Sequence, residues 1–186
     1  KELFKMGGKF ANKIYNSAKY IFGNIEDGET IKNIDEFTLE NKDKWILSRL
    51  QKAIESTDKK LKEYRFDEAS QTVYKFYWNE FCDWYIEISK FDLKESSKRE
   101  KTLSLLLYIL EESMAMIHPF MPFLTEEIYF NLPKRNIESK SLMIREYPKA
   151  KSEYIFEDIE KEFDLIKDIV SAIRNSRFLF NLPPNK

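Results

Sequence analysis

The ten residues at positions 78–87 (WNEFCDWYIE) restrict the possible folds of this chain more than any other stretch. They include four aromatic and three acidic residues and no helix breaker. A helix with so much aromatic surface must bury much of it against neighbouring elements. The stretch therefore predicts a central helix of a helical assembly, with Trp84 among its packed side chains.

Apolar residues elsewhere in the chain recur every three to four positions, which is the period of an α-helix. The period predicts helices at about residues 2–22, 41–64, 67–90, 97–118, 122–131 and 154–180. We find no internal repeat. Five or six helices with short connections predict an all-α, antiparallel bundle that forms a single domain over residues 1–186.

Local signals give further expectations for the ends and faces of these helices. Asp67 is a candidate cap for the third helix, and Ser97 with Glu100 forms a capping-box pattern for the fourth. Residues 132–150 are expected to be irregular, with residues 142–144 the one candidate for an extended strand. The last helix is expected to direct five apolar residues inward: Ile159, Phe163, Ile166, Val170 and Ile173.

The composition is that of an ordinary soluble domain. Apolar residues make up 42% and the net charge is -1, so any attraction to nucleic acid must come from a local basic patch. No apolar stretch approaches the roughly 20 residues that cross a membrane, so no membrane partner is expected. The chain starts at Lys1 and shows no signal-peptide pattern, which suggests a piece of a longer cytoplasmic protein.

The sequence lacks the residue combinations that usually form a catalytic site. Glu80, Asp83 and Glu87 lie three and four apart, on one face of an α-helix, and are expected to form its solvated edge. Cys82 and His118 are the single residues of their kinds, and no glycine-rich phosphate loop is present. We therefore expect no catalytic residue, metal ligand or cofactor site within the chain.

The first predicted helix carries a basic and amide-rich face. Its lysines recur every four residues from Lys1, and residues 1–22 contain a single acid, Glu2. The candidate contacts are Lys9, Asn12, Lys13, Asn16 and Lys19. Lysines beside hydrogen-bonding amides suit contact with a phosphate backbone, although a solvated lysine face gives the same pattern.

A second cluster, Lys44, Trp45 and Arg49, lies at the start of the second predicted helix. Trp45 either anchors the core or offers a platform on which an unpaired base stacks. The sequence leaves both roles open.

Five stretches of the chain resemble, in order, motifs of the helical anticodon-binding domain of valyl-tRNA synthetases. They lie at residues 10–20 (FANKIYNSAKY), 43–50 (DKWILSRL), 74–90 (YKFYWNEFCDWYIEISK), 117–128 (IHPFMPFLTEEI) and 172–184 (AIRNSRFLFNLPP). The second motif is shared with isoleucyl and leucyl enzymes, whereas the FCDWY core and the fourth motif are similar to the valyl branch. The family commonly has arginine where this chain has Lys19 and Lys44.

The resemblance implies a parent enzyme that attaches valine to its tRNA with ATP and magnesium, bound in a separate catalytic domain of the same chain. The catalytic signatures of that domain do not occur in these residues. The implied partner is the anticodon stem-loop of valine tRNA. Lysines of the first helix would meet phosphates, its asparagines would add hydrogen bonds, and Lys44, Trp45 and Arg49 would face the loop. The rival hypotheses are a purely structural bundle that supports the catalytic domain, the equivalent domain of an isoleucyl or leucyl enzyme, and an unrelated helical scaffold.

Overall fold

A computed structural model describes residues 2–26, 29–133 and 139–180, with side chains from residue 7 onward. The elements in chain order are α1 (Glu2–Phe22), η1 (Ile34–Glu36), α2 (Asn41–Lys62), α3 (Phe66–Tyr74), η2 (Lys75–Ile86), α4 (Glu87–Asp92), α5 (Ser96–Ile117), α6 (Pro122–Phe130), η3 (Ser152–Tyr154) and α7 (Glu157–Leu179). No strand occurs among the described residues, which confirms the all-α prediction. The candidate strand at residues 142–144 is wrong, because these residues form a turn closed by the Ile144 N–H and the Ser141 carbonyl.

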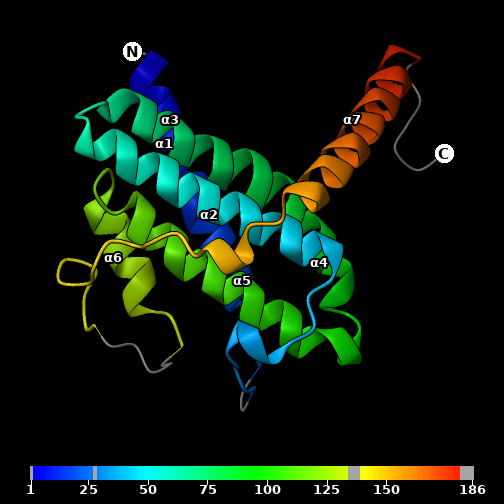
Figure 1. The fold of residues 1–186 in the computed structure, drawn as a ribbon, viewed down its shortest axis with the longest axis horizontal. Helices are drawn as coiled ribbons and strands as arrows, with labels where there is room; N and C mark the ends of the chain where they lie inside the picture. Colours follow the sequence, from blue (N-terminus) through cyan, green and yellow to red (C-terminus); the bar gives the residue numbers. More distant parts are fainter. Residues whose placement is uncertain (1, 27–28, 134–138, 181–186) are drawn as a thin grey trace.

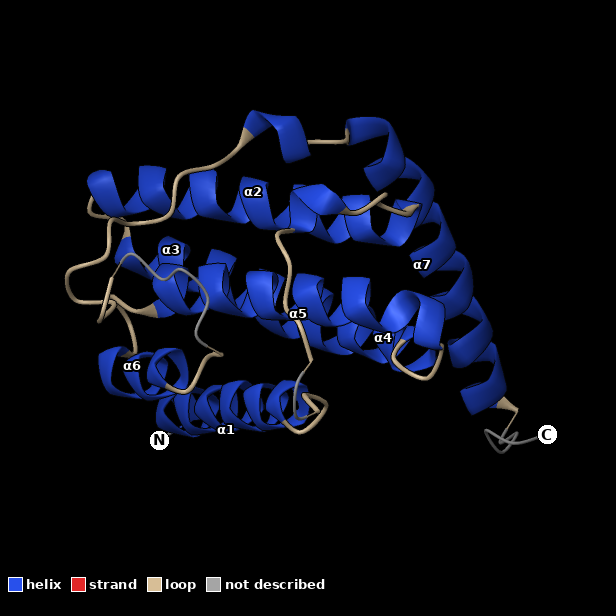
Figure 2. Cartoon of the chain, turned by 90° about the horizontal axis from the view of Figure 1, so that it is seen from below, coloured by secondary structure: helices blue, strands red, loops and turns tan. Residues whose placement is uncertain are grey.

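The helix α5 lies at the centre of the bundle. Its residues from 101 to 107 are all buried, and it contacts α1, α2, α3, α4 and α6. Figure 2 shows α2 on one side of α5 and α1 with α6 on the other. A helix that is apolar on all sides belongs inside a fold, which explains why the leucine-rich stretch takes this place.

One continuous helix runs from residue 66 to residue 92 through α3, η2 and α4, and it carries the aromatic stretch. The η2 portion is π-helical, so its hydrogen bonds reach five residues back and its turns are wider than those of an α-helix. Tyr77, Phe81 and Tyr85 are buried along it, with successive ring centroids 5.4 and 6.4 Å apart. The stretch is therefore in the core as predicted, although Trp84 is half-buried.

The wide turns of η2 place Glu80 and Asp83 on different faces, although α-helical spacing would put both carboxylates on one face. Glu80 is buried and paired with a residue of α2, whereas Asp83 is exposed and paired with a residue of α1. Residues three apart no longer share a face when a turn holds more than 3.6 residues. The expectation of a solvated acidic edge is therefore wrong for Glu80.

Two predicted helix caps are also wrong. The third helix begins at Phe66, so Asp67 lies inside its first turn. The Ser97 hydroxyl donates to the Glu95 carboxylate instead of capping, and the N-cap of α5 is Glu95, two residues earlier than the capping-box pattern predicted. An acidic residue in the first turn of a helix interacts favourably with the helix dipole whether or not it is the N-cap. The sequence therefore locates a helix start only to within about one turn.

The last helix, α7, extends away from the bundle as an arm (Figure 1). It contacts α2, and Phe163 is buried there as predicted, with Ile159 and Val170 half-buried. Ile166 and Ile173 are exposed, so the predicted inner face is wrong at these two positions. Pro183 and Pro184 lie outside the described residues.

Candidate RNA-binding surface on α1

The outward face of α1 carries a polar stripe made of Lys9, Asn12, Asn16 and Lys19, all of which are exposed. The opposite face buries four apolar residues against the bundle: Phe10, Ile14, Ala18 and Ile21. This amphipathic division fixes the rotation of α1, so the stripe must face solvent. The structure thus brings together four of the five residues that the sequence singled out on this helix.

Lys13 lies at one flank of the stripe and differs from the other lysines. Its Nζ is 2.7 Å from the Asp83 carboxylate and 5.2 Å from the centre of the Trp78 ring. Burial has the largest single effect on the pKa of Lys13 and lowers it, but the hydrogen bond to Asp83 and the attraction of nearby negative charges together outweigh burial, so the pKa is raised. Lys13 stays charged, yet part of its field is cancelled by its partner, so it is a weaker candidate for a phosphate contact.

The other flank of the stripe is a groove of about 630 Å³ between α1 and α6. Tyr15 and Lys19 line it from α1, and Glu127 and Asn131 line it from α6 and its C-terminus. Tyr15 is 54% exposed, so one part of its ring is open to a ligand. The sequence prediction missed this groove, because the spacing of residues in α6 does not indicate which helix lies beside it.

Trp45 is not a platform for a base. Its side chain is 0% exposed and stacks on Phe163 of α7, with ring centroids 4.2 Å apart and planes at 18°. A nucleobase cannot reach a ring that is covered on all sides, so the base-stacking role is wrong and the core-anchor role is confirmed. Spacing along α2 does not indicate this result, because Trp45 lies on the opposite side of the helix from the buried residues Leu47, Leu50 and Ile54 and is covered there by α7.

Arg49, one turn further along α2, is occupied by two carboxylates. Its Nε lies 3.1 Å from Glu80 Oε1, its Nη2 also donates to that oxygen, and its Nη1 lies 3.1 Å from Glu160 Oε2. Both glutamates are buried. Arg49 therefore ties α2 to η2 and α7, and the structure gives it a structural role.

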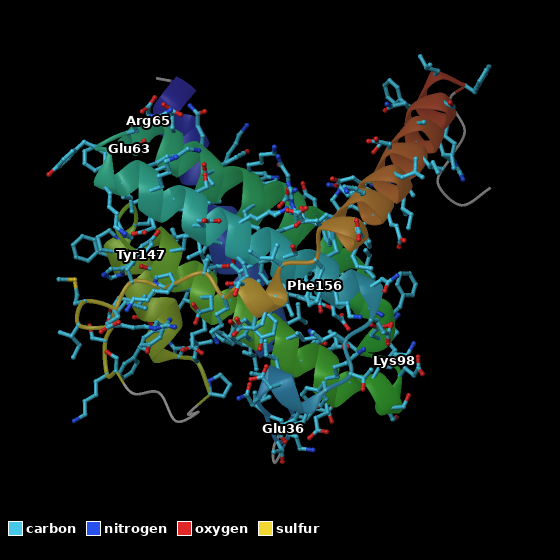
Figure 3. All side chains as sticks on the ribbon, viewed as in Figure 1. Glu36, Glu63, Arg65, Lys98, Tyr147 and Phe156 are labelled. Atoms are coloured by element: carbon cyan, nitrogen blue, oxygen red, sulfur yellow. The ribbon has the colours of Figure 1, made fainter. Side chains whose placement is uncertain are left out.

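The Glu160 carboxylate joins the start of α7 to α2 through further contacts. Ser48 donates to it, Lys52 Nζ lies 2.8 Å from it, and the Ser48 hydroxyl accepts the Phe156 N–H at 2.9 Å. Phe156 is labelled in Figure 3, at the point where the chain enters α7. Burial raises the pKa of Glu160, but bonds from Lys52, Ser48 and Arg49 lower it more, so the net pKa is below its usual value of 4.5.

Lys44, the third residue of this cluster, is half-buried and places its Nζ 5.8 Å from the centre of the Phe156 ring. A cation over an aromatic face contributes a modest attraction to the junction. The DKWILSRL motif thus fastens α7 to the bundle, and the α1 stripe is left as the candidate surface for RNA.

The remaining reactive side chains belong to the fold. Burial raises the pKa of the Cys82 thiol to about 12, and His118 Nδ1 lies 2.8 Å from Thr125 Oγ1. In residues 2–26, 29–133 and 139–180, no group of three or more His, Cys, Asp or Glu side chains is placed to hold a metal ion. The helices in these same ranges are all too short or too polar to cross a membrane.

Comparisons with known proteins indicate the family of this chain. Residues 43–186 match the family described as the anticodon-binding domain of tRNA ligase. A valine–tRNA ligase of Thermotoga maritima is 41% identical over 178 residues, which is 96% of this chain and 20% of that protein. The corresponding enzyme of Treponema denticola is 41% identical over 194 residues, and that of Geobacillus stearothermophilus is 39% identical over 182 residues.

The chain spans 20–21% of the length of these relatives. The family match covers more than half of this chain, and the structure is helical throughout its described elements. The chain belongs to the family of anticodon-binding domains of tRNA ligases.

Proposed function

We propose that this chain recognises the anticodon stem-loop of valine tRNA as part of a valine–tRNA ligase. The observation that carries the proposal is the α1 stripe, which exposes two lysines and two asparagines on one face next to a groove of about 630 Å³. The relatives named valine–tRNA ligase support the choice of valine.

The geometry of the stripe suits a phosphate backbone. Lys9 and Lys19 are ten residues apart, so about 15 Å of helix separates them, enough to follow several phosphates. Asn12 and Asn16 lie between them and can donate or accept hydrogen bonds. Backbone contacts of this kind fix the position of an RNA without reading its sequence.

The groove beside the stripe carries the kinds of side chain that recognise individual RNA bases. Proteins read RNA loops by stacking unpaired bases on aromatic rings and by bonding the base edges. Tyr15 supplies an aromatic ring. Across the groove the Asn131 amide donates to the Glu127 carboxylate at 3.2 Å, and the oxygens of both side chains are acceptors for a base edge. We propose that one unpaired base of the anticodon loop enters this groove while Lys19 holds a neighbouring phosphate.

The double substitution Lys9→Gln/Lys19→Gln tests the backbone contacts. Each lost phosphate contact should reduce the slope of log affinity against log salt concentration by about 0.7–0.9. Titration of a fluorescent stem-loop at several salt concentrations measures the slope. The matched control, Lys59→Gln/Lys140→Gln, removes two exposed lysines from other elements and should leave the slope unchanged. Equal slopes for the two double variants would contradict the assignment.

The substitution Tyr15→Ala tests the groove. Loss of one stacked base should weaken binding by about 1–3 kcal/mol without changing the salt slope, because no charge is removed. Tyr15→Phe keeps the ring and should bind nearly as well as the unchanged chain. Tyr64→Ala, which removes an exposed tyrosine from the turn between α2 and α3, is the control. If Tyr15→Ala and Tyr64→Ala bind alike, the groove does not hold a base.

The whole proposal is tested with three stem-loops: valine, isoleucine and a scrambled anticodon. Salt-sensitive binding that favours the valine loop supports anticodon reading by this domain. Weak and equal binding of all three loops would favour the rival role, a bundle that supports the catalytic domain without reading RNA. The near-neutral net charge of -1 is the observation that supports this rival role.

For the parent enzyme we propose the activity of its relatives, which are named valine–tRNA ligases. ATP and magnesium would then bind the catalytic domain of the same chain, and the site of action would be the cytoplasm, where tRNA is used.

A further inference from the structure

The arm formed by α7 exposes an unusual amount of apolar surface. Ile166, Ile169 and Ile173 are 51%, 51% and 54% exposed, and Leu165 and Phe180 are also open to solvent. Figure 3 shows side chains on both sides of the outer part of α7, which stands clear of the bundle. Exposed apolar residues are ordinary when scattered, but a contiguous stripe marks a contact surface.

A helix that packs on a bundle usually turns an apolar face toward it. The face of α7 that lies toward the bundle instead carries two cations, Lys167 and Arg174. Lys167 Nζ lies 5.3 Å from the centre of the Trp45 ring and 6.0 Å from that of Trp84, and Arg174 lies 5.2 Å from the Trp84 ring. These cation–π contacts, with the buried Phe163, hold the helix in one rotation. The rotation directs the isoleucines outward, so their exposure follows from specific contacts on the opposite side of the helix.

The exposed stripe has the spacing of a helix-packing seam. Ile166, Ile169, Ile173, Ser176 and Phe180 follow intervals of three, four, three and four residues, and all five are exposed. Four of the five are apolar and the fifth, Ser176, is small, and apolar residues at this spacing form the line along which a second helix packs. Glu162, one step before Ile166 in the same pattern, places a charge at the start of the seam.

We propose that a helical segment from the remainder of the parent chain packs along this seam. The proposal requires a longer protein, which the relatives indicate because this chain covers 20–21% of their length. It does not depend on RNA binding by α1. RNA is a poor occupant, because none of the five seam residues is a cation and Glu162 continues the seam with a negative charge.

The size of the seam favours an occupant on the same polypeptide. It offers about five side chains, whereas a stable interface between separate proteins uses roughly 20–30 residues a side. A segment joined covalently to α7 experiences an effective concentration in the millimolar range, so a small contact is enough to hold it. A second copy of this chain would have to bind without that advantage.

Cysteine labelling tests the proposal, with the label located by peptide mapping. Within these 186 residues the background is low, because Cys82 is buried and burial raises the pKa of its thiol to about 12. Ser176→Cys places a thiol on the seam, and Ser171→Cys places one at an exposed position off the seam. The two substitutions are chemically identical and nearly preserve side-chain size. Ile166→Cys adds a second seam position that does not depend on the first.

Maleimide labelling rates are compared between the 186-residue chain and the full-length enzyme. We expect the seam cysteines to label at least tenfold more slowly in the full-length monomer, with Ser171→Cys labelling equally fast in both. Equal rates at the seam in both proteins would overturn the proposal. Slowing in the short chain that grows with protein concentration would also overturn it, because a second copy would then be the occupant. RNA is absent throughout, so the result is independent of the anticodon-binding assignment.

Discussion

Replacing Trp45 with alanine should lower the free energy of unfolding by about 3–5 kcal/mol, the usual loss for a large buried aromatic residue. The indole is fully buried, stacks on Phe163 and lies under Lys167. Its removal would leave a cavity at the junction of α2 and α7 and would also loosen the arm. Urea denaturation followed by circular dichroism measures the change, and Tm should fall by roughly 6–20 °C.

Two variants control this experiment. Trp45→Phe keeps an aromatic ring against Phe163 and should lose less than half as much stability. Lys44→Ala removes the neighbouring half-buried side chain and should change stability by less than about 1 kcal/mol, because its contact with Phe156 is a single cation–π pair. A loss below about 1 kcal/mol for Trp45→Ala would show that the ring is not packed in solution.

Replacing Arg49 with methionine should lower the free energy of unfolding by about 2–4 kcal/mol. The guanidinium bonds Glu80 and Glu160, and its removal leaves the buried Glu80 carboxylate without that partner. Breaking a fully buried pair costs roughly 3–5 kcal/mol, and we expect less because the Arg49 side chain keeps 24% exposure to solvent. Methionine fills much of the same volume, so the effect reports the charge.

The double variant Arg49→Met/Glu80→Gln separates charge from packing. It removes the unpaired carboxylate, so it should recover a large part of the stability lost in Arg49→Met. Arg49→Lys should be intermediate, because a single ammonium cannot bond both glutamates as the planar guanidinium does. If the double variant is no more stable than Arg49→Met, packing and not charge accounts for the loss.

The pH dependence of these variants follows from Glu160. Its pKa in the folded protein is below 4.5, so the ionised carboxylate contributes stability above that pH, and the contribution is lost as the pH falls through the folded pKa. Arg49→Met removes one of the bonds that lower this pKa. The difference in stability between the unchanged chain and Arg49→Met should therefore narrow as the pH falls below 4.5, which acid titration of unfolding measures. A constant difference would exclude Glu160 from the effect.

The sequence predicted the helices well because their periods are long and regular. The bounds of α1 and α6 and the burial of the leucine-rich α5 agree with expectation. The wrong predictions occur where the outcome depends on the local helix type or on the exact helix end, which the spacing of apolar residues does not indicate. The π-helical turns of η2 moved Glu80 into the core, and no residue type in that stretch announces a change from 3.6 residues per turn.

Part of the candidate site could likewise be predicted from the sequence and part could not. The amphipathic pattern of α1 was sufficient to predict that Lys9, Asn12, Asn16 and Lys19 share an outer face, and the structure exposes all four. Whether they bind RNA stays a prediction. The groove with Tyr15 and Asn131 could not be predicted, because it exists only where α6 lies beside α1.

The sequence by itself determined the all-α class, the helix positions and the family resemblance, since these depend on residue spacing along the chain. The tertiary structure decided which of two similar clusters is available to a ligand. Lys44, Trp45 and Arg49 look as suitable for RNA as the α1 stripe when read along the chain, but α7 and η2 supply the ring and the carboxylates that occupy them. Those partners lie 31 to 118 residues away from the cluster in sequence, and a local pattern carries no information about contacts at that distance.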